Sequence, residues 1–264
     1  MKKDIILAII AATTITTAQA AKFAHLDEAT PQNGIIDNVY PVFDFDDDGC
    51  YPATGISRNG EQNPGLKTTG ALNGHCHDPG FLDISNTFHR YACKTGANNS
   101  EYCGHFYALY FEKDQALAGL DAFGHRHDWE HVAIWTTDGK ITHASASAHG
   151  KLDTKNRADI PFEGEHPKFV YHKEGVSTHS MRFAMPDETA ENDYGYWVTP
   201  TIVSWYEIQG NGLNNEVMRY KLNRFDYGNA ILPIKDSNFR TNLNSFRPKG
   251  YPEFSDSDIV ASKP

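Results

Sequence analysis

Residues 124–135 read Gly-His-Arg-His-Asp-Trp-Glu-His-Val-Ala-Ile-Trp, and this stretch carries the main signals for both fold and function. From Trp129 onward, aromatic and β-branched residues predominate, and such residues suit a half-buried pleated surface. The segment therefore predicts a β-strand. Ahead of it, histidines, carboxylates and an arginine crowd into a few positions, so we expect a functional site where this strand begins.

Asp128 and Glu130 are two residues apart, so in a strand both carboxylates point to the same face. Two adjacent carboxylates repel each other unless a cation or a proton lies between them. The first hypothesis is therefore a metal site. The alternative is that they form ion pairs with Arg126 or Lys113, because such pairs are common.

Two further side chains, Asp114 and His125, are expected to complete the metal site. Asp114 follows an apolar run that ends near Phe111, and residues 115–123 are long enough to fold back and bring Asp114 to the start of the next strand. Three carboxylates and one imidazole make a mostly oxygen site, which suits Mg²⁺, Ca²⁺ or Mn²⁺ better than zinc or copper. Such a site leaves positions on the ion for water or a ligand.

The other polar residues of the stretch favour supporting roles. His127 and His131 alternate with Trp129, and we expect them to face the core and hydrogen-bond within the sheet. Arg126 carries a planar guanidinium that suits the orientation of a carboxylate. We therefore expect Arg126 to assist ligand binding at the site, without a catalytic role.

A second acidic cluster, Asp-Phe-Asp-Asp-Asp-Gly, occupies residues 44–49. Asp44, Asp46 and Asp48 match the first half of a calcium loop of the D-x-D-x-D-G kind. The twelfth position is Gly55, where a standard EF-hand needs a carboxylate. The cluster predicts either a looser second calcium site or a solvated acidic turn.

The N-terminus has the features of a secretory signal peptide over residues 1–20. Lys2 and Lys3 precede an apolar run, and Ala-Gln-Ala at 18–20 matches a cleavage site. The apolar run is too short to span a bilayer. We expect a secreted protein with one domain at residues 21–264, because no linker, repeat or low-complexity segment divides it.

The chain is acidic, with a formal net charge of −10 that becomes one unit more negative without residues 1–20. Such a chain has no electrostatic reason to bind nucleic acid or anionic lipid. If it binds membranes, a feature other than bulk charge must recruit it. We expect no nucleic-acid partner and a monomer in solution.

The four cysteines are an even number in a chain expected to be exported, which favours two disulfides. Three pairings are possible in principle. The pairing with the shortest loops joins Cys50 to Cys76 and Cys93 to Cys103, and this is our prediction. Zinc binding is the weaker alternative, because the chain lacks a C-x-x-C spacing.

Short apolar runs punctuated by glycine and proline predict a mainly β protein, a single antiparallel β-sandwich with a few flanking helices. The Gly-, Asn- and Pro-rich segment 59–80 is expected to wrap the surface as a loop held by a disulfide. The expected strands are 102–111, 130–136, 168–172, 181–184 and 196–205, and the expected helices are 83–88 and 237–244.

Common catalytic motifs are missing from the sequence. It contains no G-x-S-x-G elbow, P-loop or G-x-G-x-x-G, so the lipase, kinase and dinucleotide-binding classes lack support. Cysteine catalysis is disfavoured if all four thiols are paired. We assign no catalytic residue and expect a protein that is not an enzyme.

The heptapeptide at 124–130 resembles the hallmark of the necrosis- and ethylene-inducing-protein-like (NLP) family of secreted cytolysins. Four cysteines, Asp-Asp-Asp-Gly-Cys at 46–50 and Glu-Lys-Asp-Gln at 112–115 resemble a four-cysteine subgroup of that family. The resemblance extends to Ala-Leu-Tyr-Phe-Glu-Lys-Asp-Gln at 108–115, Thr-His-Ser at 178–180, and Phe-Asp-Tyr-Gly-Asn-Ala at 225–230 with Pro233 and Asp236.

The resemblance implies a β-sandwich of two antiparallel sheets with flanking helices, similar to sea-anemone actinoporins and fungal lectins. It also implies a metal site at Asp114, His125, Asp128 and Glu130, the residues already selected on chemical grounds. Family members bind the sugar headgroups of plant glycosylinositol phosphorylceramides close to the metal. His179 corresponds to a histidine that lines the family's sugar pocket.

One departure concerns the loop before this histidine. In well-known toxic members that loop bears a tryptophan that enters the bilayer, whereas residues 173–178 here read Lys-Glu-Gly-Val-Ser-Thr. Thr178 also replaces an aspartate that often precedes the histidine. A membrane-inserting loop normally carries an amphipathic aromatic anchor, so the departure bears on cytolytic potency and host range.

The combined interpretation is a secreted virulence cytolysin without a catalytic cycle. A glycan held at the metal would give an acidic protein its affinity for the plant plasma membrane, which it would then permeabilise. One alternative is a metal-dependent hydrolase of glycans or phosphoesters, with Glu130 or His125 as general base. The other is a non-toxic glycan-binding protein.

Overall fold

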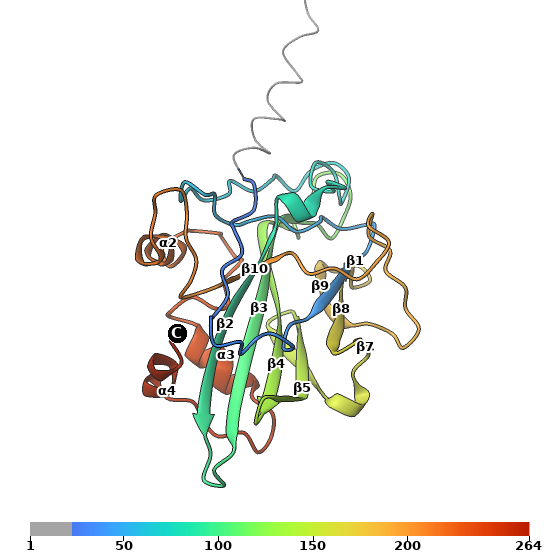
Figure 1. The fold of residues 1–264 in the computed structure, drawn as a ribbon. Coiled ribbons are helices and arrows are strands. Elements are labelled where there is room, and N and C mark those ends of the chain that lie inside the picture. The colour runs from blue at the N-terminus through green and yellow to red at the C-terminus, as the bar shows by residue number, and fades with distance from the viewer. Residues whose placement is uncertain (1–22, 264) are drawn as a thin grey trace, which may run out of the picture.

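The computed structural model describes residues 23–263, and the predicted signal peptide lies outside them. Two β-sheets pack against each other, and three helices near the C-terminus lie against the larger sheet on its far side (Figure 1). This arrangement confirms the predicted mainly β sandwich with a few helices. Within the described part of the chain, no helix combines the length and the apolar character needed to cross a membrane.

The larger sheet has six strands in the order β10-β2-β3-β4-β5-β6. Only the edge strand β10 runs parallel to its neighbour, and the other pairings are antiparallel. Its strands are β2 (Asn86–Thr95), β3 (Glu101–Asp114), β4 (His125–Thr137), β5 (Lys140–Ala148), β6 (Lys151–Asn156) and β10 (Thr201–Ser204).

The smaller sheet has four strands, with β8 paired to β1, β7 and β9. The pairing of β1 with β8 is parallel, so each sheet departs from the antiparallel prediction in one pairing. Its strands are β1 (Val42–Phe45), β7 (Phe162–Glu163), β8 (His166–Lys173) and β9 (His179–Phe183), and the helices are η1 (Phe81–Asp83), η2 (Arg157–Asp159), α2 (Asn215–Leu222), α3 (Phe239–Phe246) and α4 (Asp256–Ala261).

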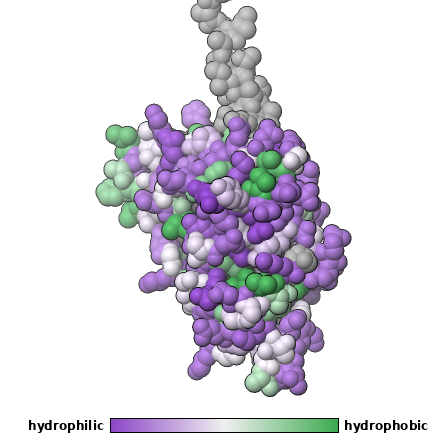
Figure 2. All heavy atoms as spheres, turned by 90° about the vertical axis from the view of Figure 1, so that its left-hand side faces the viewer, coloured by the Kyte–Doolittle hydropathy of each residue, from purple (hydrophilic) through white to green (hydrophobic). Residues whose placement is uncertain are grey.

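Alternation along β3 produces two separate cores. Side chains of one parity, among them Phe106 and Tyr110, pack with α2, α3 and the C-terminal segments. Side chains of the other parity, among them Leu109 and Phe111, pack against the smaller sheet. Both faces of β3 are therefore buried, as expected for a central strand in a layered protein. The helix-bearing side has a mainly hydrophilic surface with hydrophobic residues in separate patches (Figure 2).

Two disulfides, Cys50–Cys76 and Cys93–Cys103, confirm the predicted pairing. The second joins directly opposed residues of β2 and β3 near the hairpin between them. The first ties one end of the loop at 59–80 to the segment after β1, as the sequence predicts for that loop.

Most predicted elements are confirmed, but two are not. The expected helix at 83–88 is wrong, because η1 ends at Asp83 and β2 begins at Asn86. Phe88 is buried and pairs with Ala108 of β3, so tertiary burial overrides the local helical pattern. The expected strand 196–205 shrinks to β10, which starts after Pro200, a residue without a backbone N–H. The expected helix 237–244 is present as α3.

Candidate metal centre

The candidate centre lies where β3 ends and β4 begins. Asp114 and His125 are directly opposed in the antiparallel register, as the sequence predicts for a segment that folds back. One ligand atom each of Asp114, His125 and Asp128 lies within 4.8 Å of the others. These three residues could hold a metal ion together, and Glu130 lies two residues further along β4, outside this three-residue group.

A backbone irregularity at His127 brings these ligands together. In a regular strand, His125 and Asp128 are three residues apart and point to opposite faces. His127 has a φ of 65°, in the left-handed region that non-glycine residues rarely adopt. Its conformation interrupts the alternation, so that His125 and Asp128 share one site. Such strain is common at functional sites.

The orientation of His125 suits a metal ligand. Its Nδ1 lies 2.7 Å from the carbonyl oxygen of His127, so Nδ1–H is the donor and Nε2 keeps its lone pair. A backbone carbonyl on the second ring nitrogen is the usual way in which proteins fix a ligating histidine. The imidazole is therefore held in the tautomer that a cation needs.

Asp128 and Glu130 are like charges with little solvent around them. Burial and the charge of Asp114 raise the pKa of Asp128 to about 7, and burial and the charge of Asp128 raise the pKa of Glu130 well above its ordinary value. Asp128 accepts a hydrogen bond of 3.1 Å from Tyr171 Oη, and Glu130 accepts one from Ser147 Oγ. The donors hold the carboxylates in place but bring no positive charge.

The alternative of ion pairs with neighbouring cations is wrong. Lys113 Nζ donates to the carbonyl of Ala71 at 2.8 Å and to the side chain of Gln115 at 2.5 Å. Arg126 donates to the carbonyl of Pro64 at 3.1 Å. Over residues 23–263, no ion pair joins Asp128 or Glu130 to a lysine or arginine. No lysine or arginine of the described chain therefore pairs with these two carboxylates, and the role of Arg126 in ligand binding stays a prediction.

His179, on β9 of the smaller sheet, closes the site from the opposite side. Its Nδ1 lies 2.6 Å from Asp114 Oδ1, and its backbone N–H donates to the same carboxylate. Burial alone would lower the pKa of His179, but the hydrogen bond and the charge of Asp114 raise it. Its Nε2 lies 3.4 Å from Asp48 Oδ1. The structure thus places His179 at the predicted site.

Tyr171 and Gly49 are parts of the site that the sequence analysis missed. The ring of Tyr171 stacks on Phe111 at 3.8 Å and on His179 at 5.1 Å between centroids. A Cβ on Gly49 would lie 2.9 Å from His179 Nε2, so only glycine allows this approach. Tyr171 lies in a predicted strand, but no local pattern reveals its position opposite Asp128.

Exposure defines the mouth of the site. Asp114, Asp128 and His179 are buried, whereas His125 and Glu130 are half-buried. A ligand from solvent therefore reaches the centre past His125 and Glu130.

The remaining histidines of the hallmark stretch have packing roles, as predicted, but the predicted side-chain hydrogen bond is present for His127 and not for His131 Nε2. His127 Nδ1 lies 2.6 Å from Tyr110 Oη, and burial lowers the pKa of His127 to about 4. His131 stacks on Phe106, and burial lowers its pKa to about 4. Both imidazoles therefore stay neutral at ordinary pH.

The acidic residues 44–48 have separate environments. The carboxylate of Asp44 is buried and accepts hydrogen bonds from the backbone of Glu191 and from Asn192. Burial raises the pKa of Asp46 to about 6, and Asp48 faces His179. The second calcium site at Asp44, Asp46 and Asp48 stays a prediction, and Asp48 has a contact with the main centre that the sequence did not indicate.

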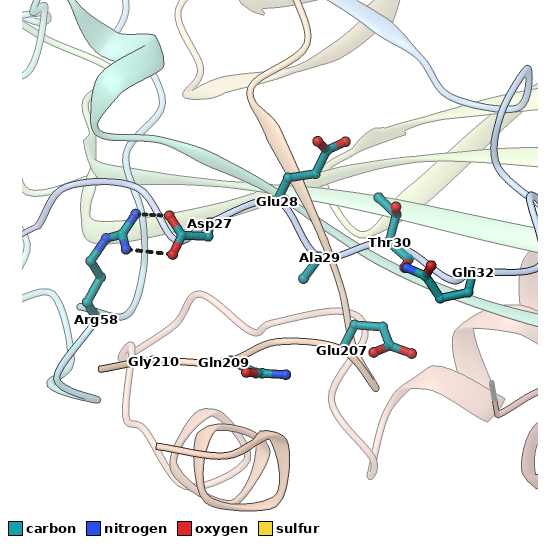
Figure 3. Close-up of a pocket in the computed structure, with 9 residues that line it drawn as sticks. All are labelled: Asp27, Glu28, Ala29, Thr30, Gln32, Arg58, Glu207, Gln209 and Gly210. Atoms are coloured by element: carbon teal, nitrogen blue, oxygen red, sulfur yellow. Dashed lines mark hydrogen bonds and ion pairs between the residues drawn. The ribbon is translucent and has the colours of Figure 1, made fainter. Parts of the chain in front are cut away.

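A polar surface pocket of about 510 Å³ lies apart from these ligands. It is lined by Asp27, Glu28 and Glu207 among other residues, and Arg58 forms a two-pronged ion pair with Asp27 (Figure 3). No candidate metal ligand lines this pocket. The centre and the pocket are therefore separate features.

Residues 35–246 match the family described as necrosis inducing protein (NPP1). The chain belongs to this family. The resemblance of the hallmark stretch to NLP proteins is thereby confirmed. Similar proteins include necrosis-inducing protein NPP1 of Phytophthora nicotianae, which is 29% identical over 75% of this chain and 76% of its own length. NLP effector protein 3 of Plasmopara viticola is 30% identical, over 76% of this chain and 81% of its own.

Solved structures have the same fold. Necrosis and ethylene inducing protein 2 from the causal agent of cocoa's witches' broom disease is 25% identical with a TM-score of 0.67, over 87% of this chain and 97% of its own. The non-toxic protein HaNLP3 is 22% identical with a TM-score of 0.68, over 87% and 99%. NLPPya in complex with glucosamine is 23% identical with a TM-score of 0.66, over 86% and 97%. NLPPya is also solved with mannosamine.

Proposed function

We propose that the protein is a secreted, non-enzymatic cytolysin that uses a divalent cation, Mg²⁺ or Ca²⁺, to bind the sugar headgroups of plant glycosylinositol phosphorylceramides. Bound in this way, it permeabilises the plasma membrane. Its relatives are necrosis-inducing effectors, which supports the class of activity. The lipid, the ion and the membrane damage are parts of the proposal.

The observation that carries the proposal is the grouping of Asp114, His125 and Asp128 within 4.8 Å, with buried carboxylates that no lysine or arginine of the described chain neutralises. Oxygen-rich sets with one imidazole suit hard divalent cations. Glu130 faces the same side and would provide the fourth ligand. When bound, the cation would supply a positive centre on which sugar hydroxyls can replace water.

The protein's own residues would hold that centre and orient the sugar. Tyr171 keeps Asp128 in place through its hydroxyl, and His179 keeps Asp114 in place through two hydrogen bonds. Glu130 and His125 are half-buried at the mouth, where they can also contact hydroxyl groups. The complexes of NLPPya with glucosamine and mannosamine support an amino sugar as ligand.

The test compares Asp128→Asn with the wild type and with the control Asp153→Asn, which changes an exposed aspartate on β6. Calorimetry measures uptake of Mg²⁺ or Ca²⁺ and of glucosamine, and dye release measures damage to vesicles of plant plasma-membrane lipid. We expect Asp128→Asn to lose all three while its far-ultraviolet spectrum is unchanged. Full dye release by Asp128→Asn would remove the cation from the proposal, and headgroup cleavage seen by mass spectrometry would replace it with a hydrolase.

A second candidate is a glycan-binding protein that leaves the membrane intact. The absence of an aromatic residue from the loop at 173–178 favours it. It predicts sedimentation with vesicles that contain the glycolipid, without dye release. The same vesicles therefore separate the two candidates.

A further inference from the structure

The loop between β3 and β4, residues 115–124, has an apolar tip. Leu117, Leu120 and Phe123 are 48%, 89% and 77% exposed, although such side chains are usually buried. The other exposed residues between 117 and 123 are alanine or glycine. We name residues 117–123 the apolar tip.

The one acidic residue of the apolar tip is turned inward. Asp121 is buried, and its carboxylate accepts hydrogen bonds from the backbone of Ala116 at 2.6 Å, Leu117 at 3.0 Å and Phe123 at 2.8 Å. These hydrogen bonds lower the pKa of Asp121 in spite of its burial, which alone would raise it. The carboxylate thus stabilises the loop conformation through backbone hydrogen bonds, and the exposed side of the apolar tip carries no charge.

The apolar tip is hydrogen-bonded to the neighbouring surface loop at 59–80. The N–H of Gly119 donates to the carbonyl of Gly70 at 2.7 Å, and the N–H of Asp121 donates to the carbonyl of Thr68 at 3.1 Å. The hydroxyl of Thr68 returns a hydrogen bond to the carbonyl of Asp121. A hydrogen-bonded loop therefore holds the two leucines and the phenylalanine at the surface. Exposed apolar groups of this kind are typical of interaction sites.

The apolar tip stands beside the candidate metal centre, because its loop starts at Asp114 and ends at His125. The turn between β8 and β9 lies close by, since His179 contacts Asp114, and this turn exposes Val176 by 89%. Exposed apolar side chains thus occur in both segments next to the candidate centre.

We propose that the apolar tip inserts into the outer leaflet of a lipid bilayer when the centre holds a membrane-bound sugar. This inference rests on the proposed function and supplies the bilayer contact that the loop at 173–178 lacks. Three large side chains are too few for a stable protein interface, which buries about 800 Å² on each partner. A bilayer needs only a few buried apolar side chains once a headgroup contact holds the protein at its surface.

The test measures binding to vesicles with and without glycosylinositol phosphorylceramide by sedimentation. The variant Leu120→Ser/Phe123→Ser removes the apolar tip. Ile231→Ser/Val260→Ser is the control, since these two residues are also apolar, more than half exposed and outside the loop. We expect the tip variant to bind glycolipid vesicles at least about tenfold more weakly. Its uptake of cation and glucosamine should match the wild type, and the control should bind like the wild type.

A second measurement locates the tip directly. In Phe123→Trp, we expect a blue shift of fluorescence on vesicle binding and quenching by lipids brominated along the acyl chain, and neither in Ile231→Trp. Unchanged vesicle binding by the tip variant, or no quenching of Phe123→Trp, would overturn the inference. So would a lipid-free dimer of the wild type that the tip variant fails to form.

Failure of the proposed function gives a different result. If Asp128→Asn binds glycolipid vesicles as well as the wild type while Phe123→Trp is still quenched, the tip inserts and the metal-bound sugar is not the membrane receptor. If Asp128→Asn loses binding while the tip variant keeps it, the metal centre recruits the protein and the tip inference is wrong.

Discussion

Two pairs of polar side chains lie within the larger sheet: two buried histidines, and the buried Asp128 with the half-buried Glu130. His89 and His105 pair across β2 and β3, with His89 Nε2 3.3 Å from His105 Nδ1, and His89 also contacts Ser204 at 2.8 Å. Asp128 and Glu130, in contrast, repel each other and meet no lysine or arginine of the described chain. A neutral pair can belong to the packing of a fold, whereas like charges held close together are the feature on which the proposed cation site rests.

The difference between the pairs has its largest consequence in acid. Burial lowers the pKa of His105 to about 3 and the pKa of His89 well below its ordinary value, helped by His105. Below about pH 6.5 these two histidines therefore bind protons in the unfolded chain but stay neutral in the folded chain. The folded state keeps its stability above that pH and loses it as the pH falls towards 3. Each histidine should lower the free energy of unfolding by about 1.4 kcal/mol per pH unit over this range.

Denaturant unfolding at pH 6.5, 5.5 and 4.5 checks this prediction. Over these two units, the pair should lower the free energy of unfolding by about 5 kcal/mol. His105→Asn should reduce the slope by about 1.4 kcal/mol per pH unit, and the exposed His149→Asn should leave it unchanged. An equal slope in wild type and His105→Asn would show that the buried pair does not control acid stability.

The carboxylate pair should respond to a cation instead. A ligand that binds only the folded state at 100 times its Kd stabilises it by about 2.7 kcal/mol. We expect Mg²⁺ or Ca²⁺ at that concentration to raise the Tm of the wild type and of His105→Asn alike. Asp128→Asn should show no rise. A rise of equal size in Asp128→Asn would place the bound ion elsewhere.

Without a cation, the carboxylate pair should destabilise the fold. Glu130→Gln keeps the shape and the acceptor oxygen for Ser147 but removes the charge next to Asp128. In the presence of a chelator, we therefore expect Glu130→Gln to be about 1–2 kcal/mol more stable than the wild type. The matched exposed change Glu163→Gln should have no effect. A loss of stability in Glu130→Gln would mean that the pair is not strained.

The sequence predicts those features of the site that depend on residues close together in the chain. The spacing of Asp128 and Glu130 predicts a shared face, and the fold-back from Asp114 to His125 follows from a short connection between two apolar runs. The left-handed backbone at His127 has no such signal, since nothing in residues 124–130 marks a break in alternation. The helix expected at 83–88 failed for a related reason, because the pairing of β2 with β3 decides that segment.

Local sequence patterns also do not predict the contacts between the two sheets. Tyr171 reaches Asp128 across 43 residues of sequence, and His179 reaches Asp114 across 65. The resemblance to NLP proteins, and not residue spacing, placed His179 at the site. Long-range packing sets these contacts, and it depends on the register of whole sheets.

The smallest predicted effect concerns Gly49, where the smaller sheet approaches the centre. A Cβ there would lie 2.9 Å from His179 Nε2 and 3.3 Å from the ring of Tyr171, so the imidazole must shift. Because His179 holds Asp114, we expect Gly49→Ala to weaken cation binding several-fold, about 1 kcal/mol. Calorimetry checks this against Gly80→Ala, whose added Cβ meets the side-chain carboxylates of Asp78 at 3.3 Å and Asp83 at 3.9 Å. If Gly49→Ala binds the cation as tightly as Gly80→Ala does, then the position of His179 does not tune the centre, and the hydrogen bonds from Tyr171 and Ser147 are sufficient to hold the carboxylates.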